Sequence, residues 1–286
     1  MATKIEWCEE SWNPITGCSP VSEGCEHCYA RRIAQRLKGR YGYPQDDPFK
    51  VTFHPERLDQ PLKWKKPRHI FVVSMGDLFH EDVRFKSIFS IWGIMAKAHW
   101  HTFLILTKRP AIMKDRLRWI RHFGRLPNIY LGVTAENQDR LDERVSILLQ
   151  IPATKHFVSI EPMLGPVDSM RYFSDPHYGT PPDGFNQGLD WIIVGGESGP
   201  GARPMHPDWP RSVRDQCQEA TVPFFFKQWG EWRPHKGRFG GGIFIKPDGT
   251  FTCQGDSWDG SAAAMNRVGK KQAGRLLEGR EYNERP

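Results

Sequence analysis

Short apolar segments, rich in β-branched and aromatic residues, recur at similar intervals through the middle of the chain. Each is nearly continuous in apolar residues, which is typical of a parallel strand covered on both faces. The six segments are HIFVVSM (69–75), TFLILT (102–107), IYLGVT (129–134), HFVSIE (156–161), DWIIVGG (190–196) and VPFFFK (222–227). The pattern therefore predicts six buried β-strands, and we expect a further strand near residues 12–17.

Amphipathic segments with apolar positions at helical spacing separate most of these strands. They cover residues 85–100, 111–123, 137–150 and 208–220. The strand centres lie roughly 27 to 35 residues apart, which is the length of a βα unit. This order favours an α/β fold built as a parallel (β/α) barrel, complete or partial and TIM-like. A doubly wound open sheet is the alternative.

Two regions interrupt the repeat. Residues 173–189 are rich in Pro, Gly and Asp and predict a long surface loop. Within residues 230–260, Pro-Asp-Gly between two apolar pairs predicts a β-hairpin, and residues 261–277 predict a short helix. We expect a barrel over residues 1–229 and a C-terminal extension over residues 230–286, packed on the barrel as an appendage or a lid.

Polar or charged side chains follow the predicted strands. They include Asp77 after Gly76, Lys108, Arg109, Thr134, Glu136, Asn137, Glu161, Glu197, Lys227 and Gln228. In a parallel barrel the carboxyl ends of the strands surround the active site, so we expect one shared pocket. Polar turns follow strands in any fold, but charged groups at six successive strand ends exceed that need. Asn137 has a second interpretation, as the N-cap of the helix that follows it.

The chain is basic, with a formal net charge of +7, which favours polyanionic partners such as nucleic acid. Basic residues concentrate at 31–40, 63–69 and 114–125, although solvated helix faces would have the same composition. Eleven tryptophans suit base stacking or an aromatic core. No secretory leader is apparent and the apolar runs are too short to cross a bilayer, so we expect a cytoplasmic protein without a membrane partner.

Three of the six cysteines, Cys18, Cys25 and Cys28, lie within eleven residues. In a reducing compartment such clustering favours a metal site over disulfides. Thiolates suit both iron–sulfur clusters and zinc. Three ligands leave one iron of a cubane cluster open to a small molecule, which favours chemistry over a scaffolding role.

The three cysteines also have other interpretations. One is a structural zinc site, with a fourth ligand from His27 or His80. Another is a closed electron-transfer cluster with a fourth cysteine, and the last is a set of unrelated buried thiols. The candidates for the fourth cysteine are Cys8, Cys217 and Cys253.

Segments distributed over almost the whole chain resemble the radical S-adenosylmethionine superfamily. They resemble more closely a largely uncharacterised three-cysteine-motif family of bacteria and their phages. The matching segments are IEWCEESWNP, GCSPVSEGCEHCYA, SMGDLF, LTKRP, GVTAEN, SIEPML, VGGESGPGARPM and FFFKQWG. The superfamily usually has three residues between its first two cysteines, whereas this chain has six.

The resemblance implies that Cys18, Cys25 and Cys28 bind a [4Fe-4S] cluster. S-adenosylmethionine would bind the open iron and be cleaved to a 5′-deoxyadenosyl radical. Gly76 and Asp77 stand where the superfamily contacts the amino group of the methionine moiety. The resemblance further implies an electron donor such as flavodoxin or ferredoxin, and we also consider a protein encoded by a neighbouring gene as a partner.

The remaining strand-end residues are assigned to the cofactor and the substrate. Thr134, Glu136 and Asn137 are candidates for the ribose of the cofactor, and Glu197 for a ribose or a cation. Glu161, Lys227 and Gln228 are the candidate catalytic residues, while Lys108 and Arg109 suit either an anion or a helix start. We expect a radical enzyme whose substrate is a nucleic acid base or a nucleotide-derived molecule. The alternative function is a non-catalytic zinc or iron–sulfur protein that binds nucleic acid.

Overall fold

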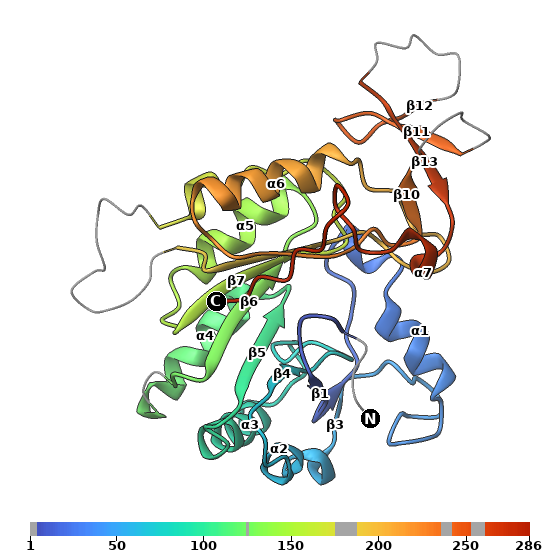
Figure 1. Cartoon of the computed structure of the whole chain (residues 1–286). Helices are drawn as coiled ribbons and strands as arrows, with labels where there is room; N and C mark the ends of the chain where they lie inside the picture. The colour runs from blue at the N-terminus through green and yellow to red at the C-terminus, as the bar shows by residue number, and fades with distance from the viewer. Residues whose placement is uncertain (1–4, 124–125, 175–187, 236–241, 253–260) are drawn as a thin grey trace.

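The computed structural model describes residues 5–123, 126–174, 188–235, 242–252 and 261–286. Within these residues, a sheet of seven parallel strands has the order β1-β4-β5-β6-β7-β8-β9. The strands are β1 (Glu10–Trp12), β4 (His69–Val72), β5 (Thr102–Thr107), β6 (Ile129–Thr134), β7 (Lys155–Ile160), β8 (Trp191–Gly195) and β9 (Phe224–Gln228). The sheet curls into a half-barrel (Figure 1), so the predicted partial TIM-like barrel is confirmed. A doubly wound sheet would reverse its strand order, and this one does not.

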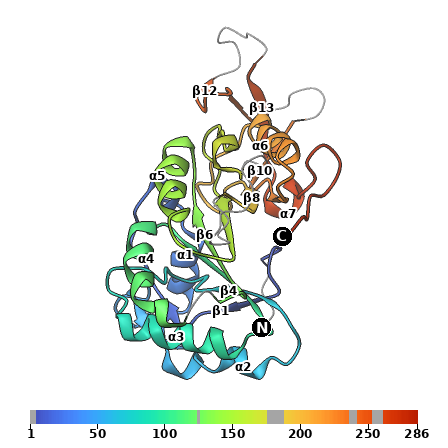
Figure 2. The same ribbon diagram turned by 90° about the vertical axis from the view of Figure 1, so that its left-hand side faces the viewer.

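Helices connect most of the strands and cover the outside of the half-barrel, and α3, α4 and α5 form a row in Figure 2. The helices are α1 (Tyr29–Arg36), α2 (Gln60–Lys63), α3 (Phe85–Lys97), α4 (Pro110–Leu117), α5 (Gln138–Leu148) and α6 (Asp208–Glu219). Short 3₁₀ segments are η1 (Glu23–Cys25), η2 (Pro55–Arg57), η3 (Arg118–Phe123) and η4 (Met170–Tyr172). The four predicted helices are therefore present. The loop predicted at 173–189 lies largely outside the described residues.

The apolar strands alternate between two cores. In β8, Ile192 and Val194 face outward into the large core beneath the helices, whereas Trp191 and Ile193 face the barrel interior. This double burial explains why the strands are apolar at nearly every position. No helix among the described residues is long and apolar enough to cross a membrane.

Aromatic rings fill the floor of the half-barrel. The indole of Trp7 lies 4.6 Å from the ring of Phe71 and 6.2 Å from that of Trp191, measured between centroids. Phe157 joins this cluster because Gly132 on the neighbouring strand has no side chain. A Cβ at Gly132 would lie 2.5 Å from the Phe157 ring. The interior is therefore a packed core below the mouth of the barrel.

The first strand differs from its predicted position. The barrel strand β1 ends at Trp12 and pairs with β4. Residues of the predicted strand that follow belong to β2 (Ile15–Thr16), which pairs antiparallel with β3 (Thr52–Phe53). Pro14 separates the two strands, and its nitrogen carries no hydrogen for a strand ladder.

The C-terminal region forms a second sheet with the order β10-β13-β11-β12. Its strands are β10 (Trp232–Pro234), β11 (Ile243–Ile245), β12 (Phe251–Thr252) and β13 (Ala263–Arg267). The predicted hairpin is present as the β11–β12 pair. The helix predicted over 261–277 is wrong, because this segment forms β13 and only one short turn of helix, α7 (Lys270–Ala273). Gly269 and Gly274 bound α7 with φ of 87° and 74°, which ends a helix at both sides.

Residues after α7 return to the half-barrel. Asn283 forms a bridge with Phe225 of β9, and the carbonyl of Glu284 accepts a hydrogen bond from the Trp191 indole at 2.9 Å. Arg285 then forms an ion pair with Glu9 at 2.9 Å, next to β1. The end of the chain therefore links the two edge strands of the open sheet.

Candidate functional site

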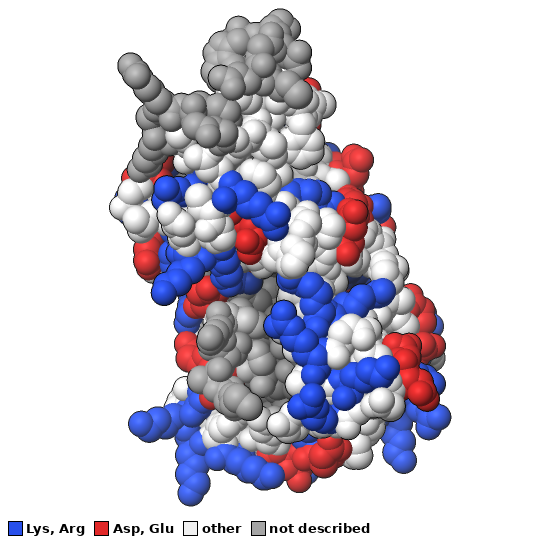
Figure 3. Space-filling view, turned by 90° about the vertical axis from the view of Figure 1, so that its right-hand side faces the viewer, with Lys and Arg blue, Asp and Glu red and all other residues white. Residues whose placement is uncertain are grey.

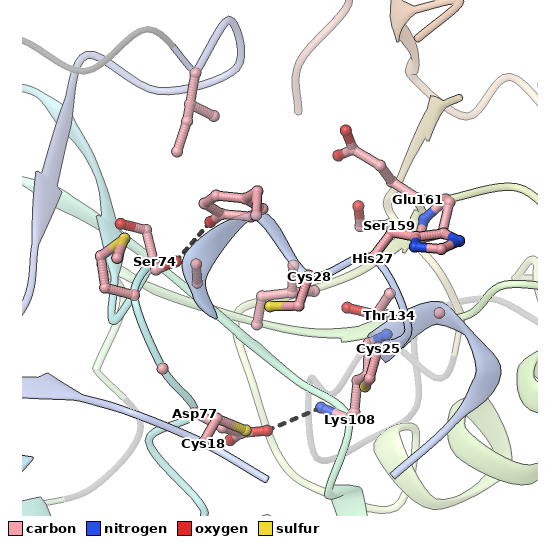
Figure 4. Close-up of a pocket in the computed structure, with 18 of the residues that line it drawn as sticks. Cys18, Cys25, His27, Cys28, Ser74, Asp77, Lys108, Thr134, Ser159 and Glu161 are labelled. Atoms are coloured by element: carbon pink, nitrogen blue, oxygen red, sulfur yellow. Dashed lines mark hydrogen bonds between the residues drawn. The ribbon is translucent and has the colours of Figure 1, made fainter. Parts of the chain in front are cut away.

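A cavity of about 550 Å³ lies at the carboxyl ends of the barrel strands. The face that carries α1 is hollowed, and Lys and Arg side chains border the hollow (Figure 3). The cavity wall contains most of the predicted site residues, and Figure 4 shows several of them. These are Cys18, Cys25, Cys28, Gly76, Asp77, Thr134, Glu161, Glu197, Lys227 and Gln228. The predicted shared pocket is therefore present, although Glu136 and Asn137 do not line it.

The cysteine loop, residues 17–28, is held against the ends of β2 and β4. Gly17 begins the loop at φ 91°, and its amide donates to the Met75 carbonyl at 2.9 Å. A Cβ at Gly76 would lie 2.6 Å from the Gly17 carbonyl oxygen, so the close approach of these two segments requires glycine. Cys28 is the N-cap residue of α1, so the loop ends where this helix begins.

The sulfurs of Cys18 and Cys25 lie in different electrostatic environments. Burial, with the charge of Asp77, raises the pKa of Cys18 to about 12, although Arg109 opposes this shift. Burial also disfavours the Cys25 thiolate, but Lys108 and hydrogen bonds within the loop outweigh it and lower the pKa of Cys25. The Ser22 hydroxyl lies 3.8 Å from the Cys25 sulfur and contributes to this effect.

The three thiols surround one part of the cavity in Figure 4. Among the described residues, no three His, Cys, Asp or Glu side chains converge on a point that would suit a single metal ion. A zinc ion needs its sulfur ligands about 2.3 Å from one centre. The cysteines around a cubane bind different irons, so their sulfurs stand further apart. The all-sulfur donor set of these three residues suits an iron–sulfur cluster.

The candidate fourth ligands differ in their positions. His80 does not line the cavity, and its two ring nitrogens contact the Ser19 hydroxyl at 2.8 Å and the Asp82 amide at 3.1 Å. Cys8 and Cys217 are buried elsewhere, and Cys253 lies outside the described residues. His27 does line the cavity.

Asp77 already has hydrogen-bond partners at both carboxylate oxygens. Oδ1 accepts from the Thr107 hydroxyl at 2.7 Å and the Phe79 amide at 2.9 Å. Oδ2 accepts from the Lys108 amide at 3.2 Å and from Arg109 Nη1 at 3.4 Å. Asp77 therefore joins the ends of β4 and β5.

Glu136 is fully buried and holds the cysteine loop. Its Oε1 accepts from the Ser22 hydroxyl at 2.7 Å and forms an ion pair with Lys108, while Oε2 accepts from Arg144 at 3.1 Å. A Cβ at Gly24 would lie 2.4 Å from the Glu136 side chain, so the loop packs directly on this carboxylate. These contacts attach the loop to β6.

Asn137 is the N-cap residue of α5, as the sequence also suggested. Its Oδ1 accepts from the Arg140 amide at 3.0 Å, and its Nδ2 donates to Glu23 of the cysteine loop at 2.6 Å. Arg140 also forms an ion pair with Glu23 at 3.2 Å. A second attachment between the loop and the barrel is therefore made at the start of α5.

Glu197 lines the cavity and is paired with Arg203, a residue to which the sequence assigned no role. Arg203 Nη2 donates to Glu197 at 2.6 Å and to the Glu23 carbonyl at 3.0 Å. The segment after β8 is thereby fixed to the cysteine loop. Sequence spacing gave no signal for this contact, because 180 residues separate Glu23 from Arg203.

The three predicted catalytic residues are in direct contact. Lys227 Nζ lies 2.7 Å and 2.8 Å from the two carboxylate oxygens of Glu161, and Gln228 Nε2 donates to the same carboxylate at 3.3 Å. A Cβ at Gly195, on the strand between them, would lie 3.2 Å from Glu161. Glycine there leaves room for the ion pair to cross from β7 to β9.

The fold and the site define a parallel half-barrel protein with a three-thiol loop at the carboxyl ends of its strands. The chain belongs to the family described as "Protein of unknown function (DUF5131)", whose model matches residues 2–286. No curated protein matches this sequence.

Solved structures similar to this chain include two of spore photoproduct lyase. One, a variant of that enzyme in which serine replaces a cysteine, is 14% identical with a TM-score of 0.45, covering 90% of this chain and 71% of that one. The other, "Spore photoproduct lyase complexed with dinucleoside spore photoproduct", is 11% identical with a TM-score of 0.41, covering 84% and 68% respectively.

Proposed function

We propose that this chain is a radical S-adenosylmethionine enzyme whose [4Fe-4S] cluster is held by Cys18, Cys25 and Cys28. The observation that carries the proposal is the position of the three thiols. They line the same cavity as the polar ends of the parallel strands. When bound, such a cluster supplies the electron that cleaves S-adenosylmethionine to a 5′-deoxyadenosyl radical.

The residues of the chain would bind both ligands and keep water away from them. Thr134 and Gly76 line the cavity and would contact the cofactor, and Asp77 would act through its neighbours. Glu161, Lys227 and Gln228, on the far wall, would contact the substrate. The aromatic floor around Trp7 excludes water from below, as a reactive radical requires.

The C-terminal extension is proposed as a partial cover for the cavity. Lys270 of α7 lines the cavity together with Ile33 of α1, so these two helices border the same opening. Lys270 also lies 3.6 Å from Glu6, next to the N-terminal segment. This contact would close one side of the opening.

The charge on the face that carries α1 supports a proposal for the substrate class. Arg31, Arg36, Lys38 and Arg40, in and just after α1, are exposed. No ion pair is formed by these four with any described residue. We name these four residues the basic rim. Exposed cations on and after a helix that lines the cavity would favour a nucleic acid whose phosphates bind the rim while one base enters the cavity.

Reduction of the cluster also requires an external electron donor. A small acidic carrier such as flavodoxin or ferredoxin suits the basic face around α1. A protein encoded by a neighbouring gene is a further candidate partner.

The decisive experiment is anaerobic purification followed by metal analysis and incubation with S-adenosylmethionine and a reductant. We expect a brown protein with about four irons per chain that forms 5′-deoxyadenosine. Cys25→Ala should lose both iron and cleavage, while Cys217→Ala, a matched change on α6 away from the cavity, should keep both. A colourless wild type with stoichiometric zinc would overturn the proposal and favour the non-catalytic nucleic-acid-binding protein.

A further inference from the structure

Arg109 is a buried cation that contacts one of the cysteine sulfurs. Only 6% of its surface is exposed, and its Nη1 lies 3.4 Å from the Cys18 sulfur as a hydrogen-bond donor. Its Nη2 donates to the Ser19 hydroxyl at 2.8 Å and to the Ser19 carbonyl at 3.2 Å. The guanidinium therefore spans the beginning of the cysteine loop.

Two carboxylates, those of Glu81 and Asp77, also contact the Arg109 guanidinium. Arg109 Nε lies 3.1 Å from Glu81 Oε2, and Nη1 lies 3.4 Å from Asp77 Oδ2. These carboxylates compensate the charge of the arginine, which lowers the cost of burying it. They also fix its orientation, which leaves the Nη1 donor within reach of Cys18.

The neighbouring cation, Lys108, occupies the corresponding place near Cys25. Its Nζ is paired with Glu136 and lies 3.4 Å from the Ser22 hydroxyl, which is 3.8 Å from the Cys25 sulfur. Lys108 acts on Cys25 through its charge and through Ser22, whereas Arg109 donates a hydrogen bond to the Cys18 sulfur directly. Of the two cations, Arg109 is the one with a hydrogen bond to a cysteine sulfur.

We propose that Arg109 is a positioning residue that orients Cys18 and raises the reduction potential of the cluster through its N–H···S hydrogen bond. The inference rests on the proposed cluster. Reduction adds negative charge to a cluster, and a charge-assisted hydrogen bond to a ligand sulfur stabilises the more negative state. An arginine that served only to attach the loop to β5 would hold the loop equally well in both oxidation states.

Arg140 provides the matched control. It also attaches the cysteine loop to the barrel, through Glu23 at 3.2 Å, and it does not line the cavity. The two arginines therefore share a structural role, and they differ in that Arg109 contacts a sulfur.

The experiment compares reconstituted wild type with Arg109→Gln, Arg109→Lys and Arg140→Gln. The readouts are iron per chain, thermal unfolding, and the midpoint potential from a redox titration followed by electron paramagnetic resonance. We expect a more negative midpoint for Arg109→Gln, a smaller shift for Arg109→Lys, and the wild-type value for Arg140→Gln. If Arg109→Gln fails to load, a negative shift in Arg109→Lys still supports the inference.

Two results would count against the inference about Arg109. Wild-type potentials in the iron-loaded Arg109 variants would overturn the inference alone and leave the proposed function intact. A wild type that binds no cluster would overturn the proposed function and the inference together.

Discussion

Lys227 and Glu161, which are 66 residues apart in the chain, form a two-pronged ion pair across the cavity wall, with N–O distances of 2.7 Å and 2.8 Å. The side chains are 13% and 20% exposed, so water screens the pair only in part. Gln228 adds a third contact to the same carboxylate. A ligand that enters this part of the cavity meets one cation and one anion that the protein already holds in place. Each can form a hydrogen bond with the ligand.

Removing one partner of this pair should destabilise the protein more than removing both. Lys227→Met leaves Glu161 without its cation, and we expect a loss of about 2 kcal/mol, given partial exposure. The double variant Lys227→Met/Glu161→Met should lose less than the sum of the two single changes. Chemical unfolding of the four proteins measures this coupling. Additive losses would show that the pair contributes little to the fold.

Asp77 should affect S-adenosylmethionine binding through the groups that it positions. Asp77→Asn keeps an acceptor for the Thr107 hydroxyl, whereas Asp77→Ala removes every hydrogen bond of the carboxylate. We expect iron to be retained in both, with weakened cofactor binding in the alanine variant and a smaller effect in the asparagine variant. Calorimetric titration of the anaerobic protein measures this. Equal losses in the two variants would instead indicate direct contact through the carboxylate charge.

The barrel floor should be intolerant of a methyl group at Gly132. Gly132→Ala brings a Cβ against the Phe157 ring, and overpacking of this kind costs about 1–3 kcal/mol. Gly93→Ala is the control, because Gly93 lies in α3 with no atom within 4 Å of the added Cβ. That change should stabilise the helix by about 1 kcal/mol. Thermal unfolding of both variants distinguishes the two effects, and equal melting temperatures would contradict the packing described for the floor.

The basic rim should carry the salt dependence of nucleic acid binding. The triple variant Arg31→Gln/Arg36→Gln/Lys38→Gln should bind single-stranded oligonucleotides more weakly. The slope of log affinity against log salt is negative, and its magnitude should decrease by about 0.7 for every phosphate that the rim no longer neutralises. Fluorescence anisotropy at several salt concentrations measures both quantities.

The control for this prediction places the same charge change on the other side of the molecule. Lys97→Gln/Lys114→Gln/Arg118→Gln alters exposed residues of α3, α4 and η3, away from α1 in Figure 1. It should leave the slope unchanged. An equal effect of the two triple variants would point to net charge alone.

The sequence by itself determined the strands of the half-barrel and the polar character of its mouth. A parallel strand buried on both faces must be apolar almost throughout, and that pattern is local, so segments such as 102–107 and 129–134 were predicted at their observed bounds. The cysteine spacing is local too. Their common loop and the order of the strands are enough to predict that the thiols lie at the mouth.

Only the tertiary structure decided what each polar group contacts. Asp77 and Glu136 were predicted as cofactor contacts, and the structure shows the protein groups that they hold, which are Thr107, Lys108 and Arg144. The Arg109–Cys18 contact spans 91 residues and leaves no local signal. Likewise, residues 263–267 form a strand because β10 and β11 lie beside them. A hydrogen bond depends on which distant segment arrives within about 3 Å, and that is settled by packing of the whole chain.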